Sequence, residues 1–383
     1  MTNLDANTLK KLLRSVFPPL PDDRAVGILV DIPRDSAADN DDWRNRRLMA
    51  QAWALDLREN ISSLSWKNVS LIGYPDVGSN NADLPSGATL VPGDLPATAS
   101  VLNTAVPETP FTRIFQDFQI FLAPTEFSST APLKIAARRY GFRAATMPGF
   151  SSAMIPALKI DYHEVNRRVE QLKEALDRAE EAEVLFRVDG EKDYRMIFDL
   201  RFRTAHASSG RFPDKGTAGN LPSGEAYIVP YEGEKEGASR TRGILPVQEN
   251  DAITLFTVSK NRAVTASGEG DFALRENDHL RREPAYGNMA ELGFGVLGDF
   301  GLKPIGRILL DEKLGFHVAF GRSEHFGGRI GPADFSSPEA VIHLDRIYIP
   351  ATQSRISLKS ITLKFPGTPE STILKNGNYT IFQ

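Results

Sequence analysis

Short apolar runs alternate with helical patterns along the first half of the chain. Runs such as AVGILVDI are continuously apolar, which is typical of strands buried on both faces of a sheet. The alternation of strand, helix and strand predicts a mostly parallel sheet with covering helices. The strands are expected at residues 25–32, 69–75, 118–124 and 142–148, and the helices at 41–60 and 130–140.

Two further segments of this half have simpler patterns. Leu9, Leu13 and Val16 lie at helical spacing before a Pro-Pro pair, which cannot continue a helix. They predict a short amphipathic helix docked on the body of the protein. Residues 76–110 are rich in Gly, Pro, Ser, Asn and Ala, and we expect them to form a long loop.

The pattern changes near the middle of the chain. Residues 161–183 carry one apolar stripe at helical spacing and predict a long helix that links the two halves. The run at 194–202 alternates apolar and other residues, as a strand does, and short strands with Gly/Pro turns follow. We therefore predict an α/β protein. Its mostly parallel α/β sheet domain would occupy residues 1–180, and a strand-rich α+β metal-binding domain would occupy 181–383.

Composition narrows the classes of partner. A chain of 383 residues is long enough for two domains. The net charge of −4 provides no basic surface, so we expect no nucleic-acid partner. No apolar run approaches the roughly 20 residues of a membrane span, and the N-terminus lacks a signal-peptide core. We therefore expect a cytoplasmic protein that does not bind membranes.

Several kinds of active site are excluded or disfavoured. The chain has no cysteine, which excludes disulfides, thiolate metal ligands and a thiol nucleophile. No glycine-rich phosphate loop follows the predicted strands, and no GxSxG elbow surrounds the serines. Any metal would therefore be held by nitrogen and oxygen, a ligand shell that suits Zn, Mn, Co or Fe(II).

Side chains that commonly bind metals gather in the second half. Three of the six histidines, His317, His325 and His343, fall in one short segment. His343 and Asp345 are two residues apart in an alternating run, so in a strand they share a face and could hold one metal ion together. The same spacing also suits a surface His–Asp pair.

The remaining candidates border apolar sequence. His317 lies in GFHVAFG, where a histidine is either a core residue or a ligand. Glu225 and Glu291 each stand beside an apolar run, where an unpaired charge would be costly. Either a metal ion or a buried Arg or Lys would remove that cost.

Taken in order, four segments resemble the M29 family of metallo-aminopeptidases, the aminopeptidase T and S group. These segments are GNLPSGEAY, AELGFG, DEKLGFHVAFG and HLD, and they span roughly residues 180–350. The resemblance implies a two-metal exopeptidase, usually a homodimer with an enclosed active site. The ligands that it implies are Glu225, Glu291, His317, His343 and Asp345.

One position departs from the family pattern. The family has a catalytic tyrosine seven residues after the first histidine, whereas this chain has Glu324 there, followed by His325. We expect one of the two, His325 in preference, to face the developing negative charge of the substrate, with Glu324 keeping the imidazole protonated. Alternatively, both side chains are solvated or pair with Arg322 and Arg329.

The chain also resembles a ring-cleaving branch of the same superfamily, the 2,5-dihydroxypyridine dioxygenases. That resemblance implies a single Fe(II) held by His317, His343 and Asp345. A non-catalytic metal-binding relative is a third possibility, and the intact ligand set argues against it.

Residues and resemblance together favour a metal-dependent, aminopeptidase-like hydrolase. We expect two divalent ions (Zn, Co, Mn or Fe) that activate a water molecule to remove N-terminal residues from peptides. Glu225 or Glu324 would serve as the general base. The partners would be a peptide or small-molecule substrate and a second copy of the chain.

Overall fold

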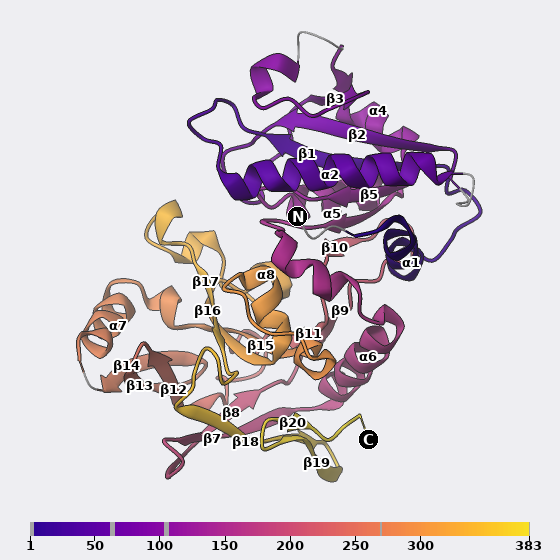
Figure 1. Ribbon diagram of the computed structural model, residues 1–383. Helices are drawn as coiled ribbons and strands as arrows, with labels where there is room; N and C mark the ends of the chain where they lie inside the picture. The colour runs from indigo at the N-terminus through magenta and orange to yellow at the C-terminus, as the bar shows by residue number, and fades with distance from the viewer. Residues whose placement is uncertain (1–3, 62–65, 103–106, 269, 383) are drawn as a thin grey trace. The chain divides into compact units, whose positions relative to one another are not determined.

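The chain divides into two compact units. The computed structural model describes residues 4–61, 66–102, 107–268 and 270–382 (Figure 1). The domain boundary expected near residue 180 stays a prediction. The first unit comprises residues up to Asn166, Ser208–Ser223 and Ile305–Leu310, and the second comprises Arg167–Ala207, Gly224–Pro304 and Asp311 onward.

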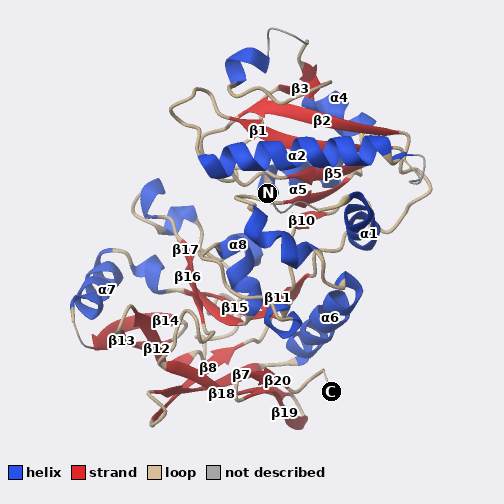
Figure 2. Cartoon of the chain, in the orientation of Figure 1, coloured by secondary structure: helices blue, strands red, loops and turns tan. Residues whose placement is uncertain are grey.

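A seven-stranded sheet forms the centre of the first unit (Figure 2). Its order is β10-β6-β5-β1-β2-β3-β4, and the pairs from β10 to β2 are parallel. The strands are β1 (Ala25–Ile32), β2 (Asn68–Pro75), β3 (Gly87–Val91), β4 (Thr109–Pro110), β5 (Ile120–Ala123), β6 (Arg143–Thr146) and β10 (Ala218–Asn220). The helices include α1 (Ala6–Val16), α2 (Asp41–Glu59), α4 (Phe111–Asp117) and α5 (Thr130–Tyr140).

Local sequence explains where these helices begin and end. The Asp5 carboxylate accepts hydrogen bonds from the Asn7 and Thr8 amides and so caps α1. Asn40 caps α2 in the same way. Gly141 ends α5 with φ 79°, a left-handed conformation that costs glycine little.

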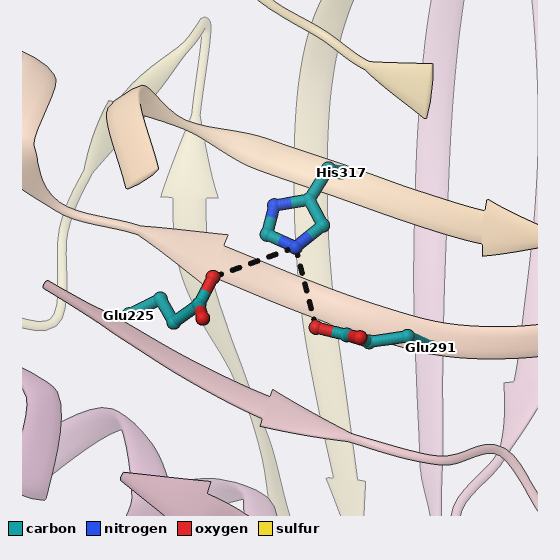
Figure 3. A group of neighbouring side chains, drawn as sticks. All are labelled: Glu225, Glu291 and His317. Atoms are coloured by element: carbon teal, nitrogen blue, oxygen red, sulfur yellow. Dashed lines mark hydrogen bonds and ion pairs between the residues drawn. The ribbon is translucent and has the colours of Figure 1, made fainter. Parts of the chain in front are cut away.

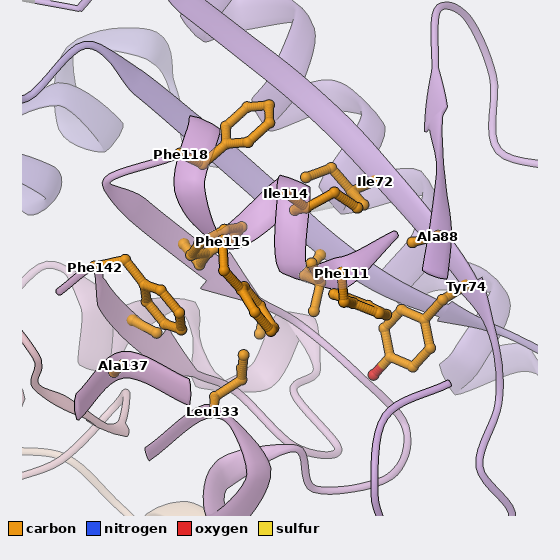
Figure 4. Packing of buried hydrophobic residues seen from close by; sticks show 14 of the residues in the cluster. Ile72, Tyr74, Ala88, Phe111, Ile114, Phe115, Phe118, Leu133, Ala137 and Phe142 are labelled. Carbon is orange, nitrogen blue, oxygen red and sulfur yellow. The ribbon is translucent and has the colours of Figure 1, made fainter. Parts of the chain in front are cut away.

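Aromatic side chains form much of the core of this unit (Figure 4). Phe111 and Phe115 from α4 pack among buried residues of the sheet and of α5. The Phe115 and Phe142 rings are stacked at 4.9 Å, and the Phe121 ring meets Phe142 edge-on at 4.8 Å. Such pairs add packing energy beyond the area they bury.

The first unit also contains a buried ion pair. The Arg143 guanidinium donates to both carboxylate oxygens of Asp23, at 2.7 and 2.9 Å, and both side chains are almost fully buried. It also donates to the carbonyls of Pro18 and Phe212. One charged side chain therefore ties the segment before β1, strand β6 and the segment before β10 together.

The second unit contains two antiparallel sheets. One has the order β14-β13-β12-β8-β7-β18-β19-β20 and the other β17-β16-β15-β11-β9. The strands are β7 (Glu181–Val188), β8 (Lys192–Asp199), β9 (His206–Ser208), β11 (Glu225–Ile228), β12 (Arg242–Glu249), β13 (Ala252–Ser259), β14 (Arg262–Gly268), β15 (Met289–Gly295), β16 (Phe316–Gly321), β17 (His343–Ile347), β18 (Ile356–Phe365), β19 (Thr368–Lys375) and β20 (Asn378–Tyr379). Its helices include α6 (Tyr162–Arg178), which begins in the first unit, and α7 (Asp271–Arg282), whereas α8 (Ile308–Asp311) belongs to the first unit up to Leu310.

The α/β fold class is confirmed, with a mostly parallel sheet in the first unit and strand-rich structure in the second. The predicted strands and helices of the first half are present within a few residues of their expected bounds. No helix among the described residues is long and apolar enough to cross a membrane.

Three expected elements differ from the structure. The helix expected at 161–183 ends at Arg178, because the residues after it pair on both sides as strand β7. The loop expected at 76–110 contains β3 and β4, which add to the β2 edge although they lack a long apolar run; residues 103–106 of this loop lie outside the described residues. The run expected to continue to Phe202 ends at Asp199, and Phe202 has φ 64° and is exposed.

We expect Asp23→Ala to lower the free energy of unfolding by about 3–5 kcal/mol, because it leaves the Arg143 charge buried without its partner. The neighbouring pair of Asp22 with Lys215 is half exposed, so Asp22→Ala should cost no more than about 1 kcal/mol. Urea denaturation of both variants would test this, and equal losses would contradict it.

Candidate metal centre

One face of the five-stranded sheet carries all five predicted ligands. Glu225 lies on β11, Glu291 on β15, His317 on β16, and His343 and Asp345 on β17. The strand register places them together, because Glu291 and Asp345 both lie opposite Ala319 on β16, two residues from His317. Residues opposite each other in antiparallel strands, and residues two apart in one strand, share a face.

Glu291 is the residue that connects the two histidines. His317 Nε2 lies 3.3 Å from one Glu291 carboxylate oxygen, and His343 Nε2 lies 3.2 Å from the other. His317 Nε2 is also 3.6 Å from Glu225 Oε2 (Figure 3). His343 Nε2 is 3.7 Å from Asp345 Oδ1.

The five side chains therefore form two sets of three that share one member. Glu225, Glu291 and His317 offer ligand atoms that lie within 4.8 Å of one another, and so do Glu291, His343 and Asp345. His317, His343 and Asp345 are divided between the two sets.

Backbone carbonyls orient both imidazoles. His317 Nδ1 lies 3.3 Å from the Gly315 carbonyl oxygen, and His343 Nδ1 lies 2.8 Å from that of Arg322. A carbonyl can only accept, so each Nδ1 carries the proton of its hydrogen bond and Nε2 faces the carboxylates. Histidines that bind metals commonly donate their other ring N–H to a backbone carbonyl in this way, which orients the ring.

Burial and neighbouring charges shift the pKa of every predicted ligand. Burial raises the pKa of Glu225 to about 7 and that of Asp345 to about 6. Burial alone would raise the pKa of Glu291 too, but its hydrogen bonds with the two histidines lower it. Burial would lower the pKa of His317 and His343, whereas Glu291 raises them to about 10 and about 9. The carboxylates of the cluster therefore favour the protonated form of both imidazoles.

Small residues leave space for these groups. An added Cβ at Gly293 would lie 2.0 Å from His317 Nε2, so the imidazole lies directly over this glycine. At Gly295 an added Cβ would lie 2.4 Å from the Lys313 carbonyl oxygen. The glycines of the segment AELGFG thus let a side chain and a turn approach β15 closely.

Sequence reasoning did not single out Lys313 as a residue of the site. Lys313, in the short turn Glu312–Leu314 before β16, is almost fully buried. Its Nζ donates to Glu225 Oε1 at 2.6 Å and also to Glu312. Burial would lower the pKa of Lys313, but these two carboxylates raise it. Its position in the sequence could have pointed to the site, because Lys313 precedes His317 by four residues in the segment DEKLGFHVAFG.

Glu324 and His325 lie in the turn Glu324–Phe326 that follows β16. Glu324 accepts two hydrogen bonds from the Arg322 guanidinium, which lower the pKa of the carboxyl group. The His325 ring lies 5.3 Å from the His343 ring, between centroids. Glu324 raises the pKa of His325, but burial and the charge of His343 outweigh it and lower that pKa to about 4; the expected role of the pair toward the substrate stays a prediction.

Aromatic rings form a row that ends at a ligand. His206 stacks on Tyr227 at 5.1 Å, Tyr227 meets Phe326 at 4.8 Å, and Phe326 lies 5.4 Å from His343. Glu225 lies two residues before Tyr227 on β11, so the two side chains share a face of the sheet. One side of the cluster is therefore apolar and aromatic.

The comparisons with known proteins support the fold. No family model matches the chain, and no curated protein matches it in sequence. The solved structure of a 2,5-dihydroxypyridine dioxygenase from Pseudomonas putida KT2440 is similar, with a TM-score of 0.59 and 14% identity over 98% of this chain and 96% of that one. Wild-type AmpT from Thermus thermophilus is also similar, with a TM-score of 0.56 and 11% identity over 98% of this chain and 99% of that one. At these identities the likeness establishes a shared fold.

We expect Gly293→Ala to impair metal binding strongly while the rest of the fold is kept, because the added methyl group would push the His317 imidazole out of place. Gly93→Ala is the matched control, since an added Cβ there meets nothing within 4 Å. Metal analysis after reloading, with circular dichroism as a check on folding, would measure both. Equal metal content in the two variants would contradict the placement of His317.

We also expect the stability of the metal-free protein to fall as the pH rises. The folded-state pKa values of His317 and His343 are raised above the ordinary value of 6.5, so their protonation stabilises the fold fully below about pH 6.5 and is lost through about pH 9–10. Urea midpoints of chelator-treated protein between pH 6.5 and 9.5 would measure the decline. In His343→Gln the fall of stability with pH should be shallower. A slope equal to that of the wild type would contradict the contribution of His343.

Proposed function

We propose that this protein is a metal-dependent hydrolase that holds two divalent ions and removes N-terminal residues from peptides. Glu291 would help to hold both ions. Glu225 and His317 would complete the ligand set of one ion, and His343 and Asp345 that of the other. The observation that carries the proposal is the sharing of Glu291 between two sets of ligand atoms.

The residues fit such a centre. Glu225 Oε2 is a buried carboxylate oxygen without a hydrogen-bond partner, a costly arrangement that a bound cation would relieve. The three carboxylates and two imidazoles offer only oxygen and nitrogen, which suits Zn, Mn, Co or Fe(II). The histidines already present Nε2 to the carboxylates.

Bound divalent ions would lower the pKa of a water molecule and polarise the scissile carbonyl group. Of the two carboxylates considered as general base, Glu225 accepts from Lys313 with Oε1 and would hold an ion with Oε2, so it would act as a ligand. The second, Glu324, is held by two hydrogen bonds from Arg322, which makes its carboxylate a weaker base. His325 would donate a hydrogen bond to the substrate as a neutral imidazole, since its pKa is low.

The substrate side chain next to the ions would be apolar or aromatic. The rings of Tyr227, Phe326 and His325 lie beside the ligands and would contact such a side chain favourably. The fold likeness to the aminopeptidase AmpT supports peptide substrates over other acyl compounds.

A second candidate is a ring-cleaving dioxygenase with a single Fe(II). The fold likeness to a 2,5-dihydroxypyridine dioxygenase favours it, and so does the row of rings, which would suit a planar substrate. The division of His317, His343 and Asp345 between two ligand sets weighs against it, as does the additional carboxylate of Glu225.

We expect protein reloaded with Zn, Mn or Co to release apolar N-terminal residues from short peptides. Glu225→Gln should lower kcat by roughly 100-fold or more, since even partners of metal ligands contribute 10- to 100-fold. Glu339→Gln, at an exposed position, is the control. Steady-state kinetics with metal content checked would measure this. Protein that is inert toward peptides but consumes O₂ with Fe(II) and a dihydroxylated ring would support the dioxygenase instead.

A further inference from the structure

Lys313 places a fixed positive charge on one side of the cluster only. Its side chain is 3% exposed and its Nζ donates to Glu225 Oε1 at 2.6 Å. The turn that carries it packs against β15, where Gly295 leaves no room for a Cβ beside the Lys313 carbonyl and donates a backbone hydrogen bond to Gly315. The ammonium group therefore has little freedom to move away from Glu225.

The other side of the cluster has no such contact. The ion-pair partner of Asp345 among the described residues is His343. Arg346, the next residue on β17, points to the opposite face, where it lies 3.8 Å from Glu276 and over the Phe272 ring. The two ligand sets thus differ by one buried ammonium group.

We propose that Lys313 makes the two metal positions unequal. This inference rests on the proposed two-metal function. The ion at Glu291, His343 and Asp345 binds first and tightly, and the ion at Glu225, Glu291 and His317 binds more weakly. Lys313 is a positioning residue: it occupies Glu225 Oε1, so that only Oε2 is left for the metal.

Electrostatics gives the direction of the effect. An ammonium group and a divalent cation on the same carboxylate repel each other, and the repulsion is strong where water is excluded. The ammonium also withdraws negative charge from the ligand through its short hydrogen bond. Both effects lower the affinity of the ion next to Glu225 and leave the ion next to Asp345 nearly unchanged.

A purely structural role for Lys313 predicts a different result. In that case the lysine would only neutralise the buried carboxylates of Glu225 and Glu312, and its removal would lower stability without changing the ratio of the two metal affinities. The ratio is therefore the quantity to measure.

The experiment is a titration of the full-length, metal-stripped protein with Zn²⁺ against a competing chelator. We expect two binding steps in the wild type. The double variant Lys313→Met/Glu312→Gln, which avoids an unpaired Glu312 charge, should raise the affinity of the weaker step by about 10- to 100-fold, the range of changes around metal ligands. The tighter step should stay within about threefold. Lys313→Arg should keep the steps unequal, and Lys303→Met, at an exposed lysine, should change neither step.

If the double variant does not fold, variants that each remove one predicted ligand show which binding step belongs to which metal position. Glu225→Gln should abolish the weaker step alone, whereas His343→Ala should abolish the tighter one. One ion in the wild type and two in the double variant would also support the inference. Two equal steps in both proteins, or loss of the tighter step in Glu225→Gln, would overturn it while leaving the two-metal function standing. No binding in any protein would overturn both.

Discussion

The Glu291 carboxylate is the group around which the candidate centre is arranged. It is buried and lies within 3.3 Å of two imidazoles, His317 on the neighbouring strand β16 and His343 on β17, the strand beyond it. A charge in this position is tolerated only with positive partners, and here they are two histidines whose pKa values Glu291 itself raises. Metal ions would replace those protons, so protonation and metal binding are competing ways to balance the same charge.

The arrangement of these side chains also depends on two small residues of the sheet. Gly293 makes room for the His317 ring, and Gly295 makes room for the turn that carries Lys313. A larger residue at either position would collide with the neighbouring strand or turn. The site therefore depends on residues that contribute no chemistry, because rigid strands hold side chains in place only where the packing between them is exact enough to leave one arrangement.

The turn after β16 separates the residues that could contact substrate from those that hold the loop. Arg322 binds Glu324 and accepts from His343 through its carbonyl oxygen, so it positions both the turn and a ligand. His325 remains beside His343 with a depressed pKa. The low pKa favours a neutral His325 next to the cluster, whereas the hydrogen bonds from Arg322 hold Glu324 within the turn.

The sequence by itself determined the periodic elements and the candidate ligands. The apolar runs of β1 and β2 and the helical patterns of α2 and α5 are local signals, and they predicted these elements well because strand and helix periodicity arises within a few residues. The resemblance of four segments to the M29 family implied five ligands, and the structure brings these five residues onto one face. The i, i+2 spacing of His343 and Asp345 was sufficient to predict that these two share it.

Tertiary structure alone decided the rest. The end of α6 at Arg178 depends on the pairing of β7 with two other strands, which no local pattern records. The position of Glu291 between the two histidines depends on the register of β15 with β16, and the contact of Lys313 with Glu225 joins residues 88 positions apart in sequence. Long-range register and burial set these contacts, and with them the charge balance of the cluster, because the cost of a buried charge is fixed by whatever the whole fold places beside it.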